Sequence, residues 1–379
     1  MIPLIAQYFS GDAGGSFLRL LDYITVRSGL ALVWSFVFCV ILGPRFIERM
    51  RAMQAIQPMR TAEGEGAISL GEMHKHKGPV PTMGGVLMLG GLLSAVLLFG
   101  SLTQPVLLLA LFAAIGYGGV GFVDDYLKVV KKNSGGLSAR KKIVAQFLLG
   151  TIFAIVYTYI YPHLVSYNAD GATAGPTFLL VPFFKDVVVN LGIFYVPFAI
   201  FVLISMSNAV NLTDGLDGLA AGVTISSALC FALVAYLVGR ESDSRYLLIP
   251  HVVGAGELTV LLAALCGACF GFLWFNSHPA QVFMGDTGSM MLGGLLGAVA
   301  LLIKQEFLLV VVGGVFVAEA LSVVLQVGSY KLRKKRIFRM APLHHHFERG
   351  GVPESKIIAR FYIVSALLAL AGLVTLKLR

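Results

Sequence analysis

The sequence predicts an all-α, polytopic membrane protein with one integral-membrane domain over residues 1–379. Hydrophobic residues make up 57% of the chain and charged residues only 13%, whereas a soluble domain carries about 25% charged residues. The mean hydropathy of +0.83 indicates the same class. The apolar residues also occur in runs long enough to cross about 30 Å of hydrocarbon as helices.

Ten apolar runs follow one another along the chain, and each is interpreted as a membrane-crossing helix. The first run lacks the flanking pattern of a cleaved signal peptide, so we expect it to stay in the membrane. The run at 289–303 is short enough to be re-entrant instead. The runs are 28–47, 83–100, 105–123, 143–163, 187–206, 219–238, 257–275, 289–303, 307–330 and 357–376.

The basic residues predict the orientation of these helices. Alternate loops carry 21 Lys and Arg residues, while the opposite loops and both termini carry 8. Because cytoplasmic loops are enriched in Lys and Arg, we expect the basic loops inside and both termini outside. The loops expected in the cytoplasm are 45–82, 124–142, 207–218, 276–288 and 331–360.

Polar clusters interrupt the apolar chain, and all of them fall on this predicted cytoplasmic side. Carboxylates beside a bilayer are costly and are retained mostly for function. Since the chain has only 20 acidic residues, the grouping of aspartates indicates a shared site. The clusters are 121–126 (GFVDDY), 211–218 (NLTDGLDG), 283–289 (FMGDTGS), 342–346 (PLHHH) and the basic segment 74–77 (HKHK).

Each acidic cluster has a structural alternative. Asp217 and Asp286 precede apolar helices, where an aspartate can cap the free N–H groups. Asp124 and Asp125 instead end a helix, where the helix dipole disfavours a carboxylate by about 0.3–1 kcal/mol. Two carboxylates there need a cation, which Lys128, one turn from Asp124, or Mg²⁺ could supply.

The glycines, histidines and cysteines in or near these clusters also allow more than one interpretation. Glycines 215, 218, 285 and 288 are either turn residues or positions where backbone N–H groups approach phosphate. The three histidines at 344–346 make a poor zinc site, because neighbours in a loop cannot all face one tetrahedral centre. Cys266 and Cys269 have the spacing of a metal or redox pair, but their apolar surroundings favour packing.

Oxygen-rich carboxylates with lysines at a bilayer surface indicate one kind of chemistry. Mg²⁺ prefers carboxylate and phosphate oxygens, and phosphoryl transfer depends mainly on positioning and charge neutralisation. The residues alone therefore predict Mg²⁺-dependent transfer between a soluble diphosphate and a lipid.

Four strings carry a resemblance to a known family: GFVDDYLK at 121–128, NAVNLTDGLDGL at 208–219, FMGDTGS at 283–289 and APLHHHFE at 341–348. They resemble the polyprenyl-phosphate N-acetylhexosamine-1-phosphate transferase superfamily, and the last resembles its phospho-N-acetylmuramoyl-pentapeptide transferase (MraY) branch. The resemblance covers nearly the whole chain. The family usually has Gly-Thr where Pro79-Val80 stands here, so the hydroxyl at position 80 is missing.

The resemblance implies a bacterial inner-membrane enzyme that transfers phospho-MurNAc-pentapeptide from UDP-MurNAc-pentapeptide to undecaprenyl phosphate, giving lipid I and UMP. Asp286 would bind Mg²⁺, and Asp124 would engage the lipid phosphate. Asp125 has also been considered as a nucleophile, so one-step attack and a covalent intermediate both stay open. The implied catalytic residues are Asp124, Asp125, Asp286, His345, Lys77 and Lys128. The implied substrate-binding residues are Thr82, Asn208, Asn211, Asp214, Gly215, Leu216, Asp217, Phe283, Gly285, Ser289, His344 and His346.

Three other functions are weighed against this one. The nearest is a GlcNAc-1-phosphate transferase of the same superfamily. An intramembrane prenyltransferase would repeat an Asp-x-x-x-Asp motif, which the chain lacks. A transporter needs polar or ionisable groups at mid-membrane, where only the ionisable Glu319 and the polar Gln326 qualify. Short loops exclude nucleic acid as a partner; contact with membrane lipid is expected, and a homodimer is left open.

Overall fold

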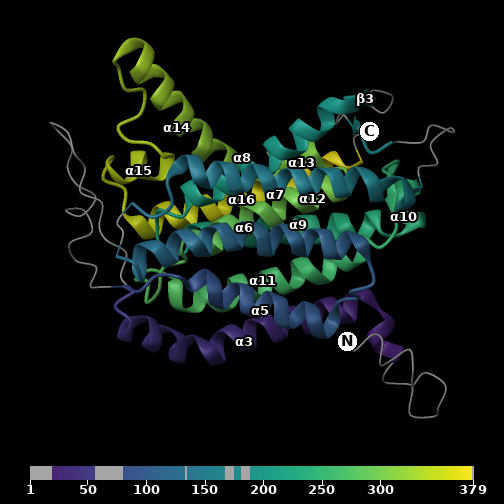
Figure 1. Ribbon diagram of the computed structural model, residues 1–379, viewed down its shortest axis with the longest axis horizontal. Coiled ribbons are helices and arrows are strands. Elements are labelled where there is room, and N and C mark those ends of the chain that lie inside the picture. The colour runs from purple at the N-terminus through teal and green to yellow at the C-terminus, as the bar shows by residue number, and fades with distance from the viewer. Residues whose placement is uncertain (1–18, 56–79, 133–134, 167–174, 181–187, 378–379) are drawn as a thin grey trace.

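The computed structural model describes residues 19–55, 80–132, 135–166, 175–180 and 188–377. Within them, nine helices are long and apolar enough to cross a membrane, which confirms the predicted all-α, multi-pass class. The helices pack side by side as an elongated bundle (Figure 1). The basic segment 74–77, with Lys77, lies outside the described residues.

The elements follow the order of the apolar runs, with short elements between them. The long helices are α3 (Ile24–Ala52), α5 (Gly84–Phe99), α6 (Pro105–Val129), α7 (Ala139–Ile160), α8 (Tyr195–Thr213), α9 (Leu219–Val238), α11 (Gly256–Asn276), α12 (Gly285–Leu302), α14 (Gly314–Arg333) and α16 (Glu354–Thr375). The shorter helices are α10 (Glu241–Leu247), α13 (Glu306–Val312), α15 (Leu343–Glu348), η1 (Arg19–Asp22), η2 (Tyr161–His163) and η3 (Gly192–Phe194). Two antiparallel pairs join β1 (Val165–Ser166) to β4 (His251–Val252), and β2 (Phe178–Leu180) to β3 (Val188–Asn190).

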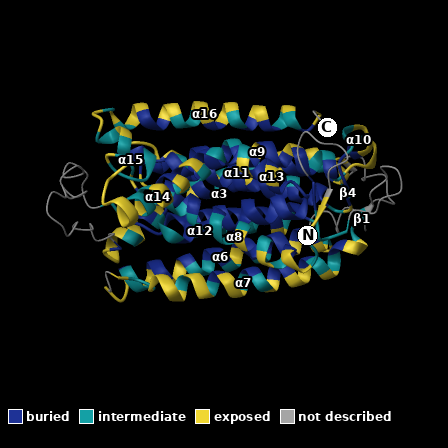
Figure 2. Cartoon of the chain, turned by 90° about the horizontal axis from the view of Figure 1, so that it is seen from above, coloured by how far each residue is buried: buried dark blue, intermediate teal, exposed yellow. Residues whose placement is uncertain are grey.

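The core of the bundle is formed by α11 and α12. Helix α11 packs against α3, α5 and α9, while α12 packs against α5, α6 and α8. Buried residues gather in this centre, and exposed residues lie on outer helices such as α7 and α16 (Figure 2). All four cysteines are free and buried, which confirms the packing interpretation of Cys266 and Cys269.

Helices α6 and α12 approach each other unusually closely at one end. A Cβ atom at Gly121 would collide with the backbone oxygen of Asp286. Small residues allow helix backbones to meet in this way within membranes. The last two turns of α6, with Asp124 and Asp125, therefore lie against the first turn of α12.

The predicted run 187–206 is wrong in its bounds. Residues 188–190 form the strand β3, and α8 begins at Tyr195 and continues to Thr213. The β-branched valines 188 and 189 favour a strand. At the other end, Asn208 and Asn211 extend the helix because neighbouring side chains satisfy their polar groups.

The later runs also differ from the prediction. The run 307–330 is two helices, α13 and α14, which meet at Gly313 and Gly314. The run 289–303 belongs to one unbroken helix, α12, from Gly285 to Leu302, which is long and apolar enough to cross a membrane. Helix α5, with 16 residues, falls short of the length that crosses a membrane unaided.

The end of the bundle opposite α15 contains a buried lysine (Figure 2 shows α10, β1 and β4 at that end). Lys304 donates hydrogen bonds to the carbonyl oxygens of Pro176 (2.7 Å) and Phe178 (2.8 Å), and lies 3.5 Å from Glu306. Its ammonium group also lies 4.0 Å from the ring centre of Tyr195. Burial lowers the pKa of Lys304 to about 8, although the Glu306 carboxylate favours the charged form.

Candidate active site

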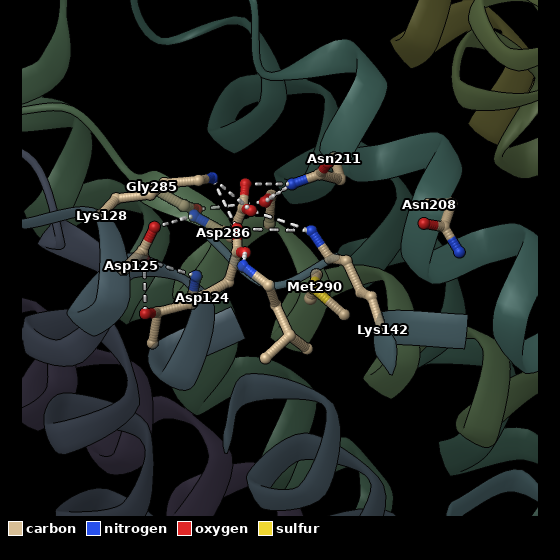
Figure 3. A network of polar contacts seen from close by, with 12 residues as sticks. Asp124, Asp125, Lys128, Lys142, Asn208, Asn211, Gly285, Asp286 and Met290 are labelled. Atoms are coloured by element: carbon tan, nitrogen blue, oxygen red, sulfur yellow. Dashed lines mark hydrogen bonds and ion pairs between the residues drawn. The ribbon is translucent and has the colours of Figure 1, made fainter. Parts of the chain in front are cut away.

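The carboxylate of Asp286 is the meeting point of three helices at the end of the bundle. Its Oδ2 atom accepts hydrogen bonds from Lys128 of α6 at 3.0 Å and from Lys142 of α7 at 2.8 Å. Its Oδ1 atom accepts a hydrogen bond from Asn211 of α8 at 2.8 Å. Figure 3 shows these side chains pointing toward Asp286. Residues up to 158 positions apart thus converge on one carboxylate.

Asp124 lies beside this carboxylate and shares its cations. The ion pair expected between Asp124 and Lys128, one turn apart, is present at 2.5 Å, and Lys142 lies 3.8 Å from the same oxygen. The other carboxylate oxygen of Asp124 accepts the backbone N–H of Leu137 at 2.6 Å. Asp124 is only 2% exposed, so two cations and one N–H group together offset its burial.

Asp125 has a different set of partners. One of its oxygens accepts the backbone N–H of Asp286 at 3.0 Å. The other accepts both the backbone N–H and the hydroxyl of Thr287, at 2.9 and 2.7 Å. Asp125 therefore caps the N-terminus of α12 from a neighbouring helix, where free N–H groups and the helix dipole favour a carboxylate.

The capping alternative for Asp286 is wrong. Asp286 lies in the first turn of α12, and its side chain faces Lys128, Lys142 and Asn211, while Asp125 supplies the cap. Gly285 makes this turn possible because its φ of +75° is a conformation that glycine adopts without strain.

Two asparagines on the last turns of α8 differ in position. Asn211 donates to Asp286 and also to Ser289, each at 2.8 Å. Asn208 instead donates to the buried side chain of Gln146 at 3.0 Å, and Figure 3 shows it apart from the carboxylates. Both had been placed in a loop from the sequence; the helix instead presents only Asn211 to Asp286.

The segment that begins at Val80 joins the site through backbone hydrogen bonds. Phe283 donates its N–H to the carbonyl of Pro81 at 2.8 Å, and Gly84 donates to the carbonyl of Phe283 at 2.9 Å. This pairing places Thr82 next to Gly285. The Thr82 hydroxyl is buried and has no hydrogen-bond partner among the described residues. Phe283 itself is half-buried.

The loop between α8 and α9 adds two further carboxylates. Burial, together with the neighbouring carboxylates of Asp286, Asp125 and Asp217, raises the pKa of Asp214 to about 8. The Asp217 carboxylate accepts the backbone N–H of Ala280 and lies 3.1 Å from the ring nitrogen of His278. The backbone N–H of Asp217 donates to Glu354. With a pKa of about 8, Asp214 is mostly protonated at pH 7, so the loop adds a neutral carboxyl group near Asp286. Asp217 connects the loop to α16. The neighbouring Leu216 is buried.

The three histidines lie on the short helix α15 rather than in a loop; the rings of His344 and His345 lie 4.2 Å apart, but each histidine has different polar partners. His344 is fully buried against Gly215; its N–H donates to Glu319 at 3.1 Å, and its ring nitrogen lies 3.2 Å from the same carboxylate. His345 pairs with Glu348 at 2.9 Å. His346 accepts the N–H of Arg339 at 3.1 Å. Glu319 is therefore a packed residue that anchors α15.

Two polar residues beside the site, Lys142 and Gln146, were not predicted from the sequence. Lys142 lies in a basic stretch of the kind that marks cytoplasmic loops in general. It differs from its exposed neighbour Lys141 only in the face of the helix from which its side chain projects. Gln146, fully buried one turn later, is a polar residue within an apolar run. A polar residue within a predicted membrane span often has a functional role, and this is the feature of the sequence that could have identified Gln146.

The comparison with protein families agrees with this arrangement. The model of Glycosyl transferase family 4 matches residues 107–304, more than half of the 379-residue chain. The chain belongs to this family. The match includes Asp124, Asp125, Asn211 and Asp286, but it ends before the histidines of α15.

Membership in glycosyl transferase family 4 establishes a phosphosugar transferase that uses a polyprenyl phosphate and a nucleotide-sugar donor at a membrane. The family is metal-dependent, and ligand oxygens of Asp124, Asp125 and Asp286 lie within 4.8 Å of one another. These residues could hold a metal ion.

Proposed function

We propose that this protein transfers phospho-MurNAc-pentapeptide from UDP-MurNAc-pentapeptide to undecaprenyl phosphate in the bacterial cytoplasmic membrane, releasing UMP and forming lipid I. The observation that carries the proposal is the convergence of Asp124, Asp286, Lys128 and Lys142 at one end of an apolar bundle. The choice of the muramoyl donor rests on the sequence string 342–347, PLHHHF.

The carboxylates fit Mg²⁺ by the chemistry of their oxygens. Mg²⁺ is usually held by one or two carboxylates together with waters and phosphate oxygens. The three hydrogen bonds of Asp125 anchor the first turn of α12, whereas Asp286 and Asp124 face ammonium groups that a metal ion can replace, so Asp286 and Asp124 would hold the ion. When bound, Mg²⁺ would neutralise charge on the diphosphate.

The reaction needs an attacking oxygen, a leaving group and exclusion of water. An oxygen of the lipid phosphate forms a bond to the sugar-linked phosphorus, and the bond from that phosphorus to the UMP oxygen breaks. A phosphate monoester has its second pKa near 6, so at pH 7 the attacking oxygen is mostly deprotonated. Asp124 would then orient the lipid phosphate rather than remove a proton.

The remaining residues would bind the donor. Lys128, Lys142 and, from outside the described residues, Lys77 would neutralise the diphosphate, and His345 of α15 would be a further donor. Asn211, Asp214 and Phe283 would surround the nucleotide, and the half-buried Phe283 ring offers a face for uracil. The unpartnered Thr82 hydroxyl beside Gly285 is a candidate phosphate donor. The engaged oxygens of Asp125 support one-step attack over a covalent intermediate.

One assay tests this function. Purified protein is incubated with Mg²⁺, undecaprenyl phosphate and either UDP-MurNAc-pentapeptide or UDP-GlcNAc, and UMP release is measured. We expect release with the first donor only. Equal turnover of both donors would contradict the muramoyl assignment and favour the GlcNAc-1-phosphate branch.

The role of Asp286 is tested in the same assay. Asp286→Ala should abolish transfer while the protein stays monodisperse in detergent. Asp243→Ala, at an acidic residue of α10 that pairs with Arg240 at 3.5 Å, is the matched control and should keep full activity. Near-normal activity of Asp286→Asn would overturn the metal-ligand role, because an amide is a poor substitute for a carboxylate at Mg²⁺.

A further inference from the structure

The Oδ2 atom of Asp286 is crowded by two ammonium groups. Lys128 and Lys142 both donate to it, at 3.0 and 2.8 Å, while Oδ1 is engaged by Asn211. A divalent ion that binds this carboxylate must therefore replace at least one of these partners. Repulsion between the ion and two lysines at this distance would otherwise oppose binding.

The two lysines are not held equally. Lys128 lies on the same helix as Asp124 and is fixed between Asp124 at 2.5 Å and Asp286. Lys142 comes from the first turn of α7, and its second carboxylate, Asp124, is 3.8 Å away. Because Lys142 has one close carboxylate partner where Lys128 has two, it is the side chain that can leave at the lower cost.

From this asymmetry, and resting on the proposed diphosphate transfer, we propose that Lys142 is an exchangeable counter-ion. It neutralises Asp286 before a divalent ion arrives, and it moves to the phosphates of the donor when the ion replaces it. Three carboxylates and two ammonium groups leave the cluster with one formal negative charge, which suits entry of a cation. The incoming diphosphate gives the displaced ammonium group a new partner.

The exchange predicts opposite effects of one substitution on two ligands. In full-length protein purified in detergent, Mn²⁺ binding is measured by electron paramagnetic resonance, and UDP binding is measured by calorimetry at saturating Mn²⁺. Lys142→Met should bind Mn²⁺ at least about tenfold more tightly, because a positive charge a few ångström from the ion has been removed. The same variant should bind UDP about tenfold more weakly.

Two further variants serve as controls. Lys141→Met removes the same charge from the exposed neighbouring position and should leave both affinities unchanged. Lys142→Arg keeps the charge and should bind Mn²⁺ much as the wild type does. Together they show whether the effects of Lys142→Met come from the loss of the charge at position 142.

The outcomes separate the exchange from the proposed function. Equal or weaker Mn²⁺ binding by Lys142→Met would overturn the exchange while leaving the transferase intact. Tighter Mn²⁺ binding with unchanged UDP affinity would overturn the movement of Lys142 to phosphate. Absence of Mn²⁺ binding to the wild type would overturn the metal site itself, and the exchange with it.

Discussion

One carboxylate oxygen of Asp125 accepts both the backbone N–H and the hydroxyl of Thr287, at 2.9 and 2.7 Å. The other oxygen accepts the N–H of Asp286 at 3.0 Å. This contact makes Asp125 the link that fixes the first turn of α12 against the end of α6. It gives the two adjacent aspartates separate roles, because only Asp124 pairs with Lys128.

Asp125→Asn should therefore lower stability and reduce transfer only in part. An amide has one accepting oxygen, so at least one of three hydrogen bonds is lost, at a cost of about 1–3 kcal/mol. The apparent melting temperature in detergent measures this loss. Thr287→Ser keeps the hydroxyl and is the control. If Asp125→Asn abolished transfer with an unchanged melting temperature, or a glycosyl-phosphorylated Asp125 were trapped, the anchoring role would be wrong.

Asp124→Asn should lower kcat by more than the roughly 10²–10⁴-fold expected for loss of proton transfer alone. The reason is that the substitution also removes the charge that holds Lys128 at 2.5 Å. Steady-state rates over a pH series provide the measurement. Full recovery of the variant at high pH would show that Asp124 is a simple base.

Glu319→Leu should loosen α15 without directly changing the carboxylate cluster. It removes the acceptor of the His344 N–H group and leaves a buried imidazole beside an apolar side chain. Loss of such a contact costs about 1–3 kcal/mol, so amides in 343–348 should exchange hydrogen faster by roughly 5–150-fold. Ser322→Ala, at a buried hydroxyl one turn away that donates to the Glu319 backbone carbonyl, is the control. Unchanged exchange in Glu319→Leu would show that α15 is held by its other contacts.

Lys304 predicts a pH dependence of stability. Its pKa is about 8 in the folded protein, below its ordinary value of 10.5. Between these two values the unfolded chain holds the proton and the folded protein does not, so the free energy of unfolding rises with pH, by at most about 3 kcal/mol. The stability of the wild type relative to Lys304→Met should therefore increase between pH 8 and pH 10. A constant difference across this range would contradict the lowered pKa.

The sequence is sufficient to predict the class of the fold and the residues of the polar clusters. It is not sufficient to predict which residues contact one another within the site. Hydropathy locates the spans because burial in lipid needs long apolar runs. It fails at the C-terminus of α8, where Asn208 and Asn211 continue the helix because Gln146 and Asp286 satisfy their amides. The partners of Asp125 could not be inferred either, since the N–H groups that it accepts lie 161 and 162 residues away.

The contact between Gly121 and the backbone oxygen of Asp286 has a consequence for the reacting groups. With no side chain between them, the two helix backbones touch one turn before Asp124, and carboxylate oxygens of Asp124 and Asp286 lie within 4.8 Å of each other. A single methyl group at position 121 would push the two helices, and these carboxylates with them, apart without altering any charge. The spacing of the charged cluster thus depends on a residue that carries no functional group.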